Sequence, residues 1–118
     1  MILIDTSIWI RHFKSPNERL VSLLSDNQVA IHEFIIGELA CGQLKFREEI
    51  LELLQTLPLL PTLSHEEVLY MINKRKLYGS GIGWVDAHLV ASTLVTKNHV
   101  WSYDKSLINI TEKLNISL

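Results

Sequence analysis

The chain has 118 residues, enough for one domain with its own core, and we expect a single domain over residues 1–118. Hydrophobic residues make up 47% and charged residues 20%, as in ordinary globular proteins, and no apolar run approaches the roughly 18 residues of a membrane span. The net charge of −2, with 13 acidic residues against 11 Lys and Arg, argues mildly against a nucleic-acid-binding protein, which usually carries a basic surface.

In chain order, short apolar runs bounded by turn residues predict strands at residues 2–4, 28–32 and 99–103. Periodic apolar patterns predict helices over residues 33–41, 46–57, 64–78, 84–96 and 105–115. Strands that alternate with helices are typical of an α/β fold with a mainly parallel sheet, here a small one of four or five strands. Residues 79–83 ("GSGIG") predict a flexible connector.

Two helix starts carry capping signals. Ser15, with Pro16 at the first helical position and Glu18 three residues after the cap, predicts that a helix begins there. Ser64 and Glu67 have the spacing of a second capping box.

The single cysteine, Cys41, cannot form an internal disulfide, which suits a reducing compartment. Asp5 interrupts the first apolar run and no basic segment precedes it, so a secretory signal is not expected. We therefore expect a cytoplasmic protein, with Cys41 packed as a small buried hydrophobe.

Four acids occupy similar places in this pattern. Asp5 and Asp104 each directly follow a predicted strand, Glu38 lies early in the helix after the second strand, and Asp86 lies in the first turn of the helix over 84–96. Because ligands of parallel α/β sheets bind outside the carboxyl ends of the strands, all four are candidates for the same edge.

Each acid alone has a simpler interpretation, because a carboxylate in the first turn of a helix stabilises that helix by about 0.3–1 kcal/mol. A cluster is different, since two carboxylates about 4 Å apart repel by ~4 kcal/mol at a surface-like dielectric. A cation among them would relieve that repulsion, and oxygen ligands without a Cys or His constellation favour Mg²⁺ or Mn²⁺ over Zn²⁺. Such a site suits phosphodiester hydrolysis by a metal-activated water.

Four segments, in this order, resemble the PIN domain, in particular the VapC-type toxins of bacterial toxin–antitoxin pairs: "LIDTSIWI", "EFIIGELACG", "GIGWVDAHLVASTL" and "VWSYDKSL". The resemblance covers nearly the whole chain and implies a three-layer α/β/α fold and a Mg²⁺- or Mn²⁺-dependent endoribonuclease. The family's acidic quartet falls on Asp5, Glu38, Asp86 and Asp104. Of these, Asp5 and Asp86 are expected as metal ligands, Glu38 supports the second side of the site, and Asp104 is the least direct ligand.

Two hydroxyl residues accompany the quartet. Thr6 matches the family's hydroxyl beside the first acid, and Ser102 stands where the family often has Thr. The resemblance also implies that water attacks the phosphorus, leaving a 5′-phosphate and a 3′-hydroxyl, with transfer or ribosomal RNA as substrate. It further implies a homodimer and a cognate antitoxin whose helical tail covers an apolar flank.

Three alternatives stay open: an RNA-processing or DNA-cleaving nuclease that is not a toxin, a non-catalytic interaction protein on the same scaffold, and a receiver-like phosphoryl-transfer domain. The last normally needs a Lys at a strand end, and no Lys takes that place convincingly. Loss of one of the four acids would have favoured the interaction protein, but all four are present.

Several other features have two interpretations. The basic run 73–76 ("NKRK") suits either a helix C-terminus or an RNA-backbone contact, and without the four site acids 9 acids face 11 basic residues. Seven leucines over 51–63 exceed the need of one helix face, and an exposed surplus would suit a dimer or antitoxin surface. The tryptophans and histidines are expected to pack rather than to stack on bases or bind metal: Trp9, Trp84, Trp101 and His88.

Overall fold

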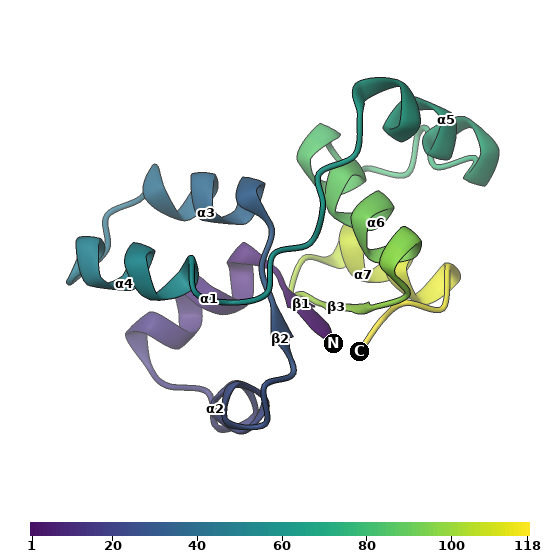
Figure 1. The fold of residues 1–118 in the computed structure, drawn as a ribbon. Helices are drawn as coiled ribbons and strands as arrows, with labels where there is room; N and C mark the ends of the chain where they lie inside the picture. The colour runs from purple at the N-terminus through teal and green to yellow at the C-terminus, as the bar shows by residue number, and fades with distance from the viewer.

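A parallel three-stranded sheet forms the centre of the computed structural model, which describes all residues from 1 to 118. The strands are β1 (Ile2–Ile4), β2 (Val29–Ala30) and β3 (His99–Trp101), in the spatial order β2-β1-β3. The central strand β1 pairs with both neighbours, since Ile2 lies opposite Val29 on one side and His99 on the other (Figure 1). The carboxyl ends of all three strands therefore point to one edge of the sheet.

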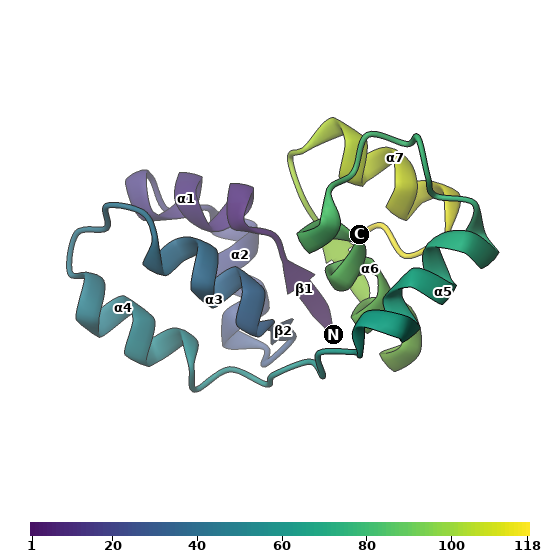
Figure 2. The same cartoon turned by 90° about the horizontal axis from the view of Figure 1, so that it is seen from above.

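Seven helices surround the sheet: α1 (Thr6–Lys14), α2 (Glu18–Ser25), α3 (Glu33–Ala40), α4 (Arg47–Leu54), α5 (His65–Arg75), α6 (Trp84–Thr96) and α7 (Lys105–Lys113). Seen from above, α1 to α4 gather on one side of β1 and α5 to α7 on the other (Figure 2). The expected α/β class with a parallel sheet is confirmed. The short helix α1, which joins the end of β1 to α2, had no residue range of its own in the sequence pattern.

The sheet has three strands rather than the four or five expected. Two further segments pair through single residues, Leu59 with Ile31 and Ser117 with Val100. Pro58 and Pro61 flank the first of these segments, and a proline has no N–H to donate to a ladder. Leu59 therefore extends the sheet by one residue pair without forming a strand.

The start of α2 also differs from the prediction, because its N-cap is Asn17 and not Ser15. The Oδ1 atom of Asn17 accepts a hydrogen bond from the N–H of Leu20 at 3.0 Å. The N–H of Asn17 donates in turn to Nδ1 of His12 at 3.0 Å. These two contacts hold residue 17 at the helix entrance, so Pro16 lies before the cap instead of inside the first turn.

The core is built from 19 buried apolar residues that enclose the sheet, with Leu3 and Ile4 of β1 fully buried among them. Trp9 is also buried, as expected. Cys41 is exposed, so the expectation of a buried cysteine was wrong. It is the C-cap of α3, where the chain leaves the helix and turns away from the core.

The capping box at the start of α5 is present as predicted. Ser64 Oγ accepts a hydrogen bond from the Glu67 N–H at 3.1 Å, and Glu67 Oε1 accepts one from the Ser64 N–H at 2.9 Å. Replacing Ser64 by Ala should lower the free energy of unfolding by about 1 kcal/mol, and the midpoint of thermal unfolding by about 3–5 °C. Thermal denaturation followed by circular dichroism checks this. Ser22→Ala on the exposed side of α2 is the control, and an equal effect of both would contradict the capping contribution.

Candidate active site

Asp5 lies directly after β1, where the ladder between β1 and β3 continues by one residue. Its N–H donates to the carbonyl oxygen of Trp101 at 2.9 Å, which fixes the backbone, and its side chain is only 6% exposed. Two hydroxyls donate to Oδ2 of this carboxylate: Ser102 Oγ at 2.7 Å and Ser7 Oγ at 2.9 Å. The carboxylate is therefore held from both sides, and its Oδ1 atom is left without a partner from the chain.

Asp104 sits two residues beyond Ser102, after β3. Its N–H donates to Ser102 Oγ at 2.9 Å, so the same hydroxyl contacts both acids. The Oδ1 atom of Asp104 accepts a hydrogen bond from the Leu107 N–H at 3.0 Å and caps α7. One carboxylate oxygen thus serves the helix, while the other remains for a ligand.

Glu38 reaches the same edge from α3. Its Oε1 atom accepts a hydrogen bond from Thr6 Oγ1 at 2.8 Å, so the hydroxyl next to Asp5 orients this acid. Glu38 is exposed and also lines a groove of about 680 Å³ between α1, α3 and the start of α4. Thr6 therefore links the residue after Asp5 to Glu38, the second acid of the predicted quartet.

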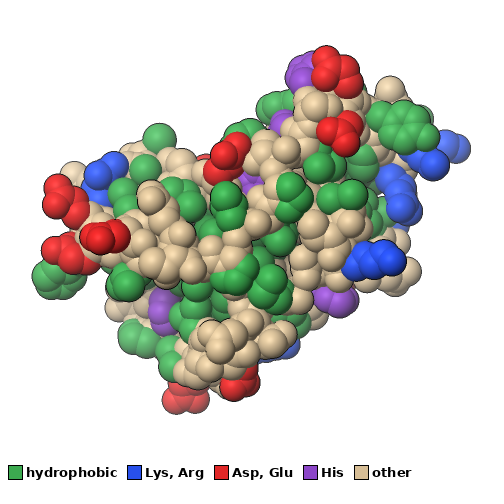
Figure 3. Space-filling model, viewed as in Figure 1, with side chains coloured by type: hydrophobic (Ala, Val, Ile, Leu, Met, Phe, Trp, Pro, Cys, Tyr) green, Lys and Arg blue, Asp and Glu red, His purple; other side chains and the backbone are tan.

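Asp86 lies in the first turn of α6, half-buried, and does not cap that helix, because the N-cap is Gly83. Burial, and then the negative charges of Asp5, Asp104 and Glu38 in that order, together raise the pKa of Asp86 to about 6. Asp86 therefore lies within electrostatic range of the other three predicted acids. Figure 3 shows the surface hollowed between the parts of the molecule that carry α3 and α6.

The donor set fits a hard cation. The acids offer only oxygen atoms, and a cation would offset the repulsion that raises the pKa of Asp86. No group of three or more His, Cys, Asp and Glu side chains is arranged so that it could hold a metal ion. Mg²⁺ typically takes only one or two protein carboxylates and keeps several waters, so the pair Asp5 and Asp86 would satisfy it.

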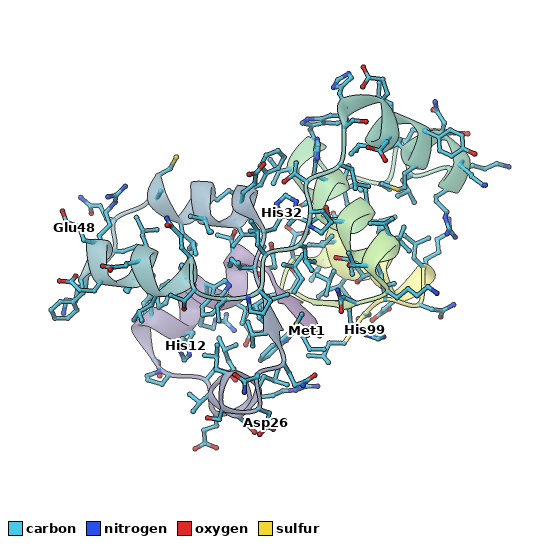
Figure 4. The ribbon with its side chains drawn as sticks, in the orientation of Figure 1. Met1, His12, Asp26, His32, Glu48 and His99 are labelled. Atoms are coloured by element: carbon cyan, nitrogen blue, oxygen red, sulfur yellow. The ribbon has the colours of Figure 1, made fainter.

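The histidines do not serve as metal ligands at this edge of the sheet. Figure 4 shows His12, His32 and His99 in separate parts of the molecule. His88 is 5% exposed and packs between the rings of Phe34 and Trp84, whose centroids lie 4.8 and 4.7 Å from its own. Burial, with a smaller contribution from His65, lowers the pKa of His88. The ring is therefore neutral at pH 7 and serves as packing.

Comparison with known proteins agrees with this architecture. The model of the PIN domain matches residues 2–113. The chain belongs to the PIN domain family. It is 44% identical over 108 residues to Ribonuclease VapC32 of Mycobacterium tuberculosis, in strain CDC 1551 / Oshkosh and equally in strain ATCC 25618 / H37Rv. The aligned residues make up 91% of this chain and 87% of each relative, which confirms the resemblance to VapC-type toxins.

One residue of this PIN domain site was missed in the sequence. Ser7 donates to Asp5, lies 3.4 Å from Ser102 Oγ, and accepts a hydrogen bond from the Tyr103 N–H at 3.0 Å. It is the third residue of the segment "DTS". Because its hydroxyl contacts residues that directly follow β3, it links the end of β1 to the end of β3. Its place two residues after Asp5 was the only available signal, since a serine in a first helical turn more often has a local role.

The raised pKa of Asp86 predicts a pH effect on stability. The folded protein holds a proton on Asp86 up to pH 6, whereas an unfolded chain loses it near the ordinary pKa of 3.8, so stability falls as the pH rises between these values. In EDTA at pH 8, Asp86→Asn should therefore unfold about 2–5 °C above the wild type, and the gain should vanish near pH 4. Thermal unfolding at both pH values measures this.

The exposed acid at the end of α2 offers a matched control, because Asp26→Asn removes one negative charge away from the site. A gain at pH 8 that is equal in Asp26→Asn and Asp86→Asn would contradict a specific repulsion at the sheet edge.

Proposed function

We propose that this PIN domain protein is a metal-dependent endoribonuclease and the toxin of a toxin–antitoxin pair. The main support is the arrangement at the carboxyl edge of the sheet, where Ser102 contacts both Asp5 and Asp104 and Thr6 orients Glu38. Asp86 lies within electrostatic range of these acids. The relatives that share 44% of the residues carry the name ribonuclease, which agrees with that chemistry.

In this proposal Asp5 and Asp86 hold Mg²⁺, for which Mn²⁺ can substitute. Glu38 and Asp104 complete the negative wall of the site, and Asp104 is the acid with the least direct part because one of its oxygens caps α7. A bound Mg²⁺ would polarise the phosphoryl group and lower the pKa of the attacking water. Water rather than a side chain attacks, so the cut leaves a 5′-phosphate and a 3′-hydroxyl.

The hydroxyl residues act through the acids. Ser7 and Ser102 both donate to Oδ2 of Asp5 and so keep that carboxylate in one rotamer, with Oδ1 free for the cation. Thr6 does the same for Glu38. Fixing these oxygens before substrate arrives reduces the reorganisation that the reaction would otherwise require.

The partners we propose are RNA, with transfer or ribosomal RNA as substrate, a cognate antitoxin, and a second copy of the chain in a homodimer. The leucine-rich segment supports a protein partner, because Leu53 and Leu59 are 67% and 59% exposed. Leu53 also lines an apolar groove of about 270 Å³ between α1, α2 and α4. No helix of the structure is long and apolar enough to cross a membrane, and we propose that the protein acts in the cytoplasm.

The decisive experiment is cleavage of total RNA by purified protein freed of its antitoxin. With Mg²⁺ or Mn²⁺ we expect discrete fragments that bear 5′-phosphates, and no cleavage in EDTA. Asp5→Asn and Asp86→Asn should each lower the rate by at least a hundredfold, because each removes a charge that holds the metal. Ligation-based sequencing of the 5′-phosphate ends measures both the rate and the sites.

The matched control is Glu48→Gln. It removes an exposed acid in the first turn of α4, at the left end of the molecule in Figure 4. Cleavage that survives both aspartate variants would point to a contaminant or another site. Metal binding without cleavage of any RNA would favour the non-catalytic interaction protein. Cleavage of RNA precursors alone, with no growth arrest on expression, would favour an RNA-processing nuclease.

The hydroxyl of Ser102 offers a finer test. Ser102→Ala removes the donor at 2.7 Å from Asp5 and the acceptor of the Asp104 N–H, and should lower the cleavage rate about tenfold. Ser102→Thr keeps the hydroxyl and should retain most of the activity. Measured Mn²⁺ affinity should fall with Ser102→Ala as well. Equal losses in the two variants would show that packing, and not the hydroxyl, is the contribution of residue 102.

A further inference from the structure

Two large aromatic side chains beside the start of α6 are exposed to solvent. Tyr78 is 66% exposed and Trp84 is 40% exposed, although tryptophan was expected to pack. Both line a cavity of about 230 Å³, whose apolar floor includes Ile72, Leu77 and Ile82. Two exposed aromatic rings beside an apolar hollow form a contiguous apolar patch, and such patches often mark binding surfaces.

Two histidine rings hold Trp84 in place. The ring of His88 meets it nearly perpendicularly, at 4.7 Å and 87°, and the ring of His65 lies 5.0 Å away. His88 in turn packs on Phe34 of α3 at 4.8 Å. A ring fixed by two neighbouring rings loses little further freedom when a planar ligand stacks on its open side.

The connector 79–83 lets a ligand come close to the backbone. A side chain at Gly79 or Gly83 would meet nothing within 4 Å, so the space next to both residues is open. The N–H groups of residues 81–83 donate to no backbone carbonyl, and they border the uncapped start of α6. Both glycines line the cavity, which therefore combines stacking rings with open backbone.

Positive charge lies beside the cavity. Lys76 is exposed and directly precedes Leu77 of the cavity floor, whereas Lys74 and Arg75 line a separate groove with Leu94. Figure 3 shows Lys and Arg side chains gathered at the end of the molecule that carries α5. Aromatic rings interleaved with cations are the pattern of surfaces that bind single-stranded nucleic acid, where rings stack on bases and cations contact phosphates.

The cavity is next to the acids but separate from them. Trp84 and Asp86 lie two residues apart at the start of the same helix, and a step of two residues turns a helix by about 200°, so they project to opposite sides. A strand that crosses the start of α6 would place one nucleotide in the cavity and the cleaved phosphate near Asp86. The cavity would thus hold a neighbouring base.

We propose that the Tyr78–Trp84 cavity binds a nucleobase of single-stranded RNA adjacent to the cleaved bond, with a backbone phosphate near Lys76. This rests on the proposed ribonuclease function and adds a base-binding site to it. The cation beside the cavity favours RNA over an apolar protein side chain as its occupant, because a phosphate accompanies every base.

The test compares two probes by fluorescence anisotropy in EDTA, where cleavage is not expected. One is a fluorescein-labelled ten-nucleotide RNA of mixed sequence, and the other has the same ribose-phosphate chain without bases. Trp84→Ala should weaken binding of the RNA about tenfold and leave binding of the abasic chain unchanged, because only stacking is lost. Trp84→Phe should retain most of the affinity, and thermal unfolding verifies that both variants fold.

Two further variants separate stacking from charge. Tyr70→Ala removes another exposed tyrosine, 64% exposed and outside the cavity, and should change neither affinity. Lys76→Gln should weaken both probes and lower the slope of log affinity against log salt concentration by about 0.7. The base preference should survive this change.

The outcomes separate this proposal from the function on which it rests. Wild-type protein that cleaves total RNA, together with an unchanged base preference in Trp84→Ala, would overturn the cavity and leave the nuclease standing. Wild-type protein that neither cleaves nor binds RNA would overturn both. A Trp84→Ala variant that loses a copurifying protein partner but binds both probes normally would assign the cavity to that partner and overturn its role in RNA binding.

Discussion

The parallel pairing of β1 with β3 is the contact on which the rest of the site depends. It continues past the strands through the hydrogen bond from the Asp5 N–H to the Trp101 carbonyl at 2.9 Å, and the next residue, Ser102, then contacts Oδ2 of Asp5. A slip of one residue would turn Asp5 to the other face of the sheet and separate it from Ser102. The register of the pairing between β1 and β3 therefore also fixes the geometry of the site.

At the sheet edge that this pairing creates, acidic side chains repel one another. Asp86 is half-buried, and burial together with the charges of three other acids raises its pKa, so the folded chain accommodates its negative charge poorly. Asp104 shows how the fold limits this cost, because one of its oxygens caps α7 and only the other is left without a partner from the chain. A capping role and a site role are thus compatible in one carboxylate.

Much of this arrangement could be predicted from local patterns. The capping box at Ser64 was correct because both partners lie within one helical turn. The N-cap of α2 was wrong because a contact from His12, outside the pattern, favours Asn17. The number of strands was overestimated, since Pro58 and Pro61 limit the pairing of Leu59 to one residue. Asp5, Asp86 and Asp104 could be named because each follows a strand or opens a helix. Glu38 was expected early in its helix but lies in the last turn of α3, and only the family resemblance named it.

The sequence by itself determined the order of elements, the parallel α/β class, the family resemblance and the four acids, because these depend on spacing along the chain. Only the tertiary structure decided which side chains meet. In the tertiary structure Ser7 donates a hydrogen bond to Asp5, Cys41 is exposed, and Trp84 packs on His88 while it stays partly exposed. The physical reason is that burial and long-range hydrogen bonds depend on how helices from distant parts of the chain pack on the sheet, which no local pattern records.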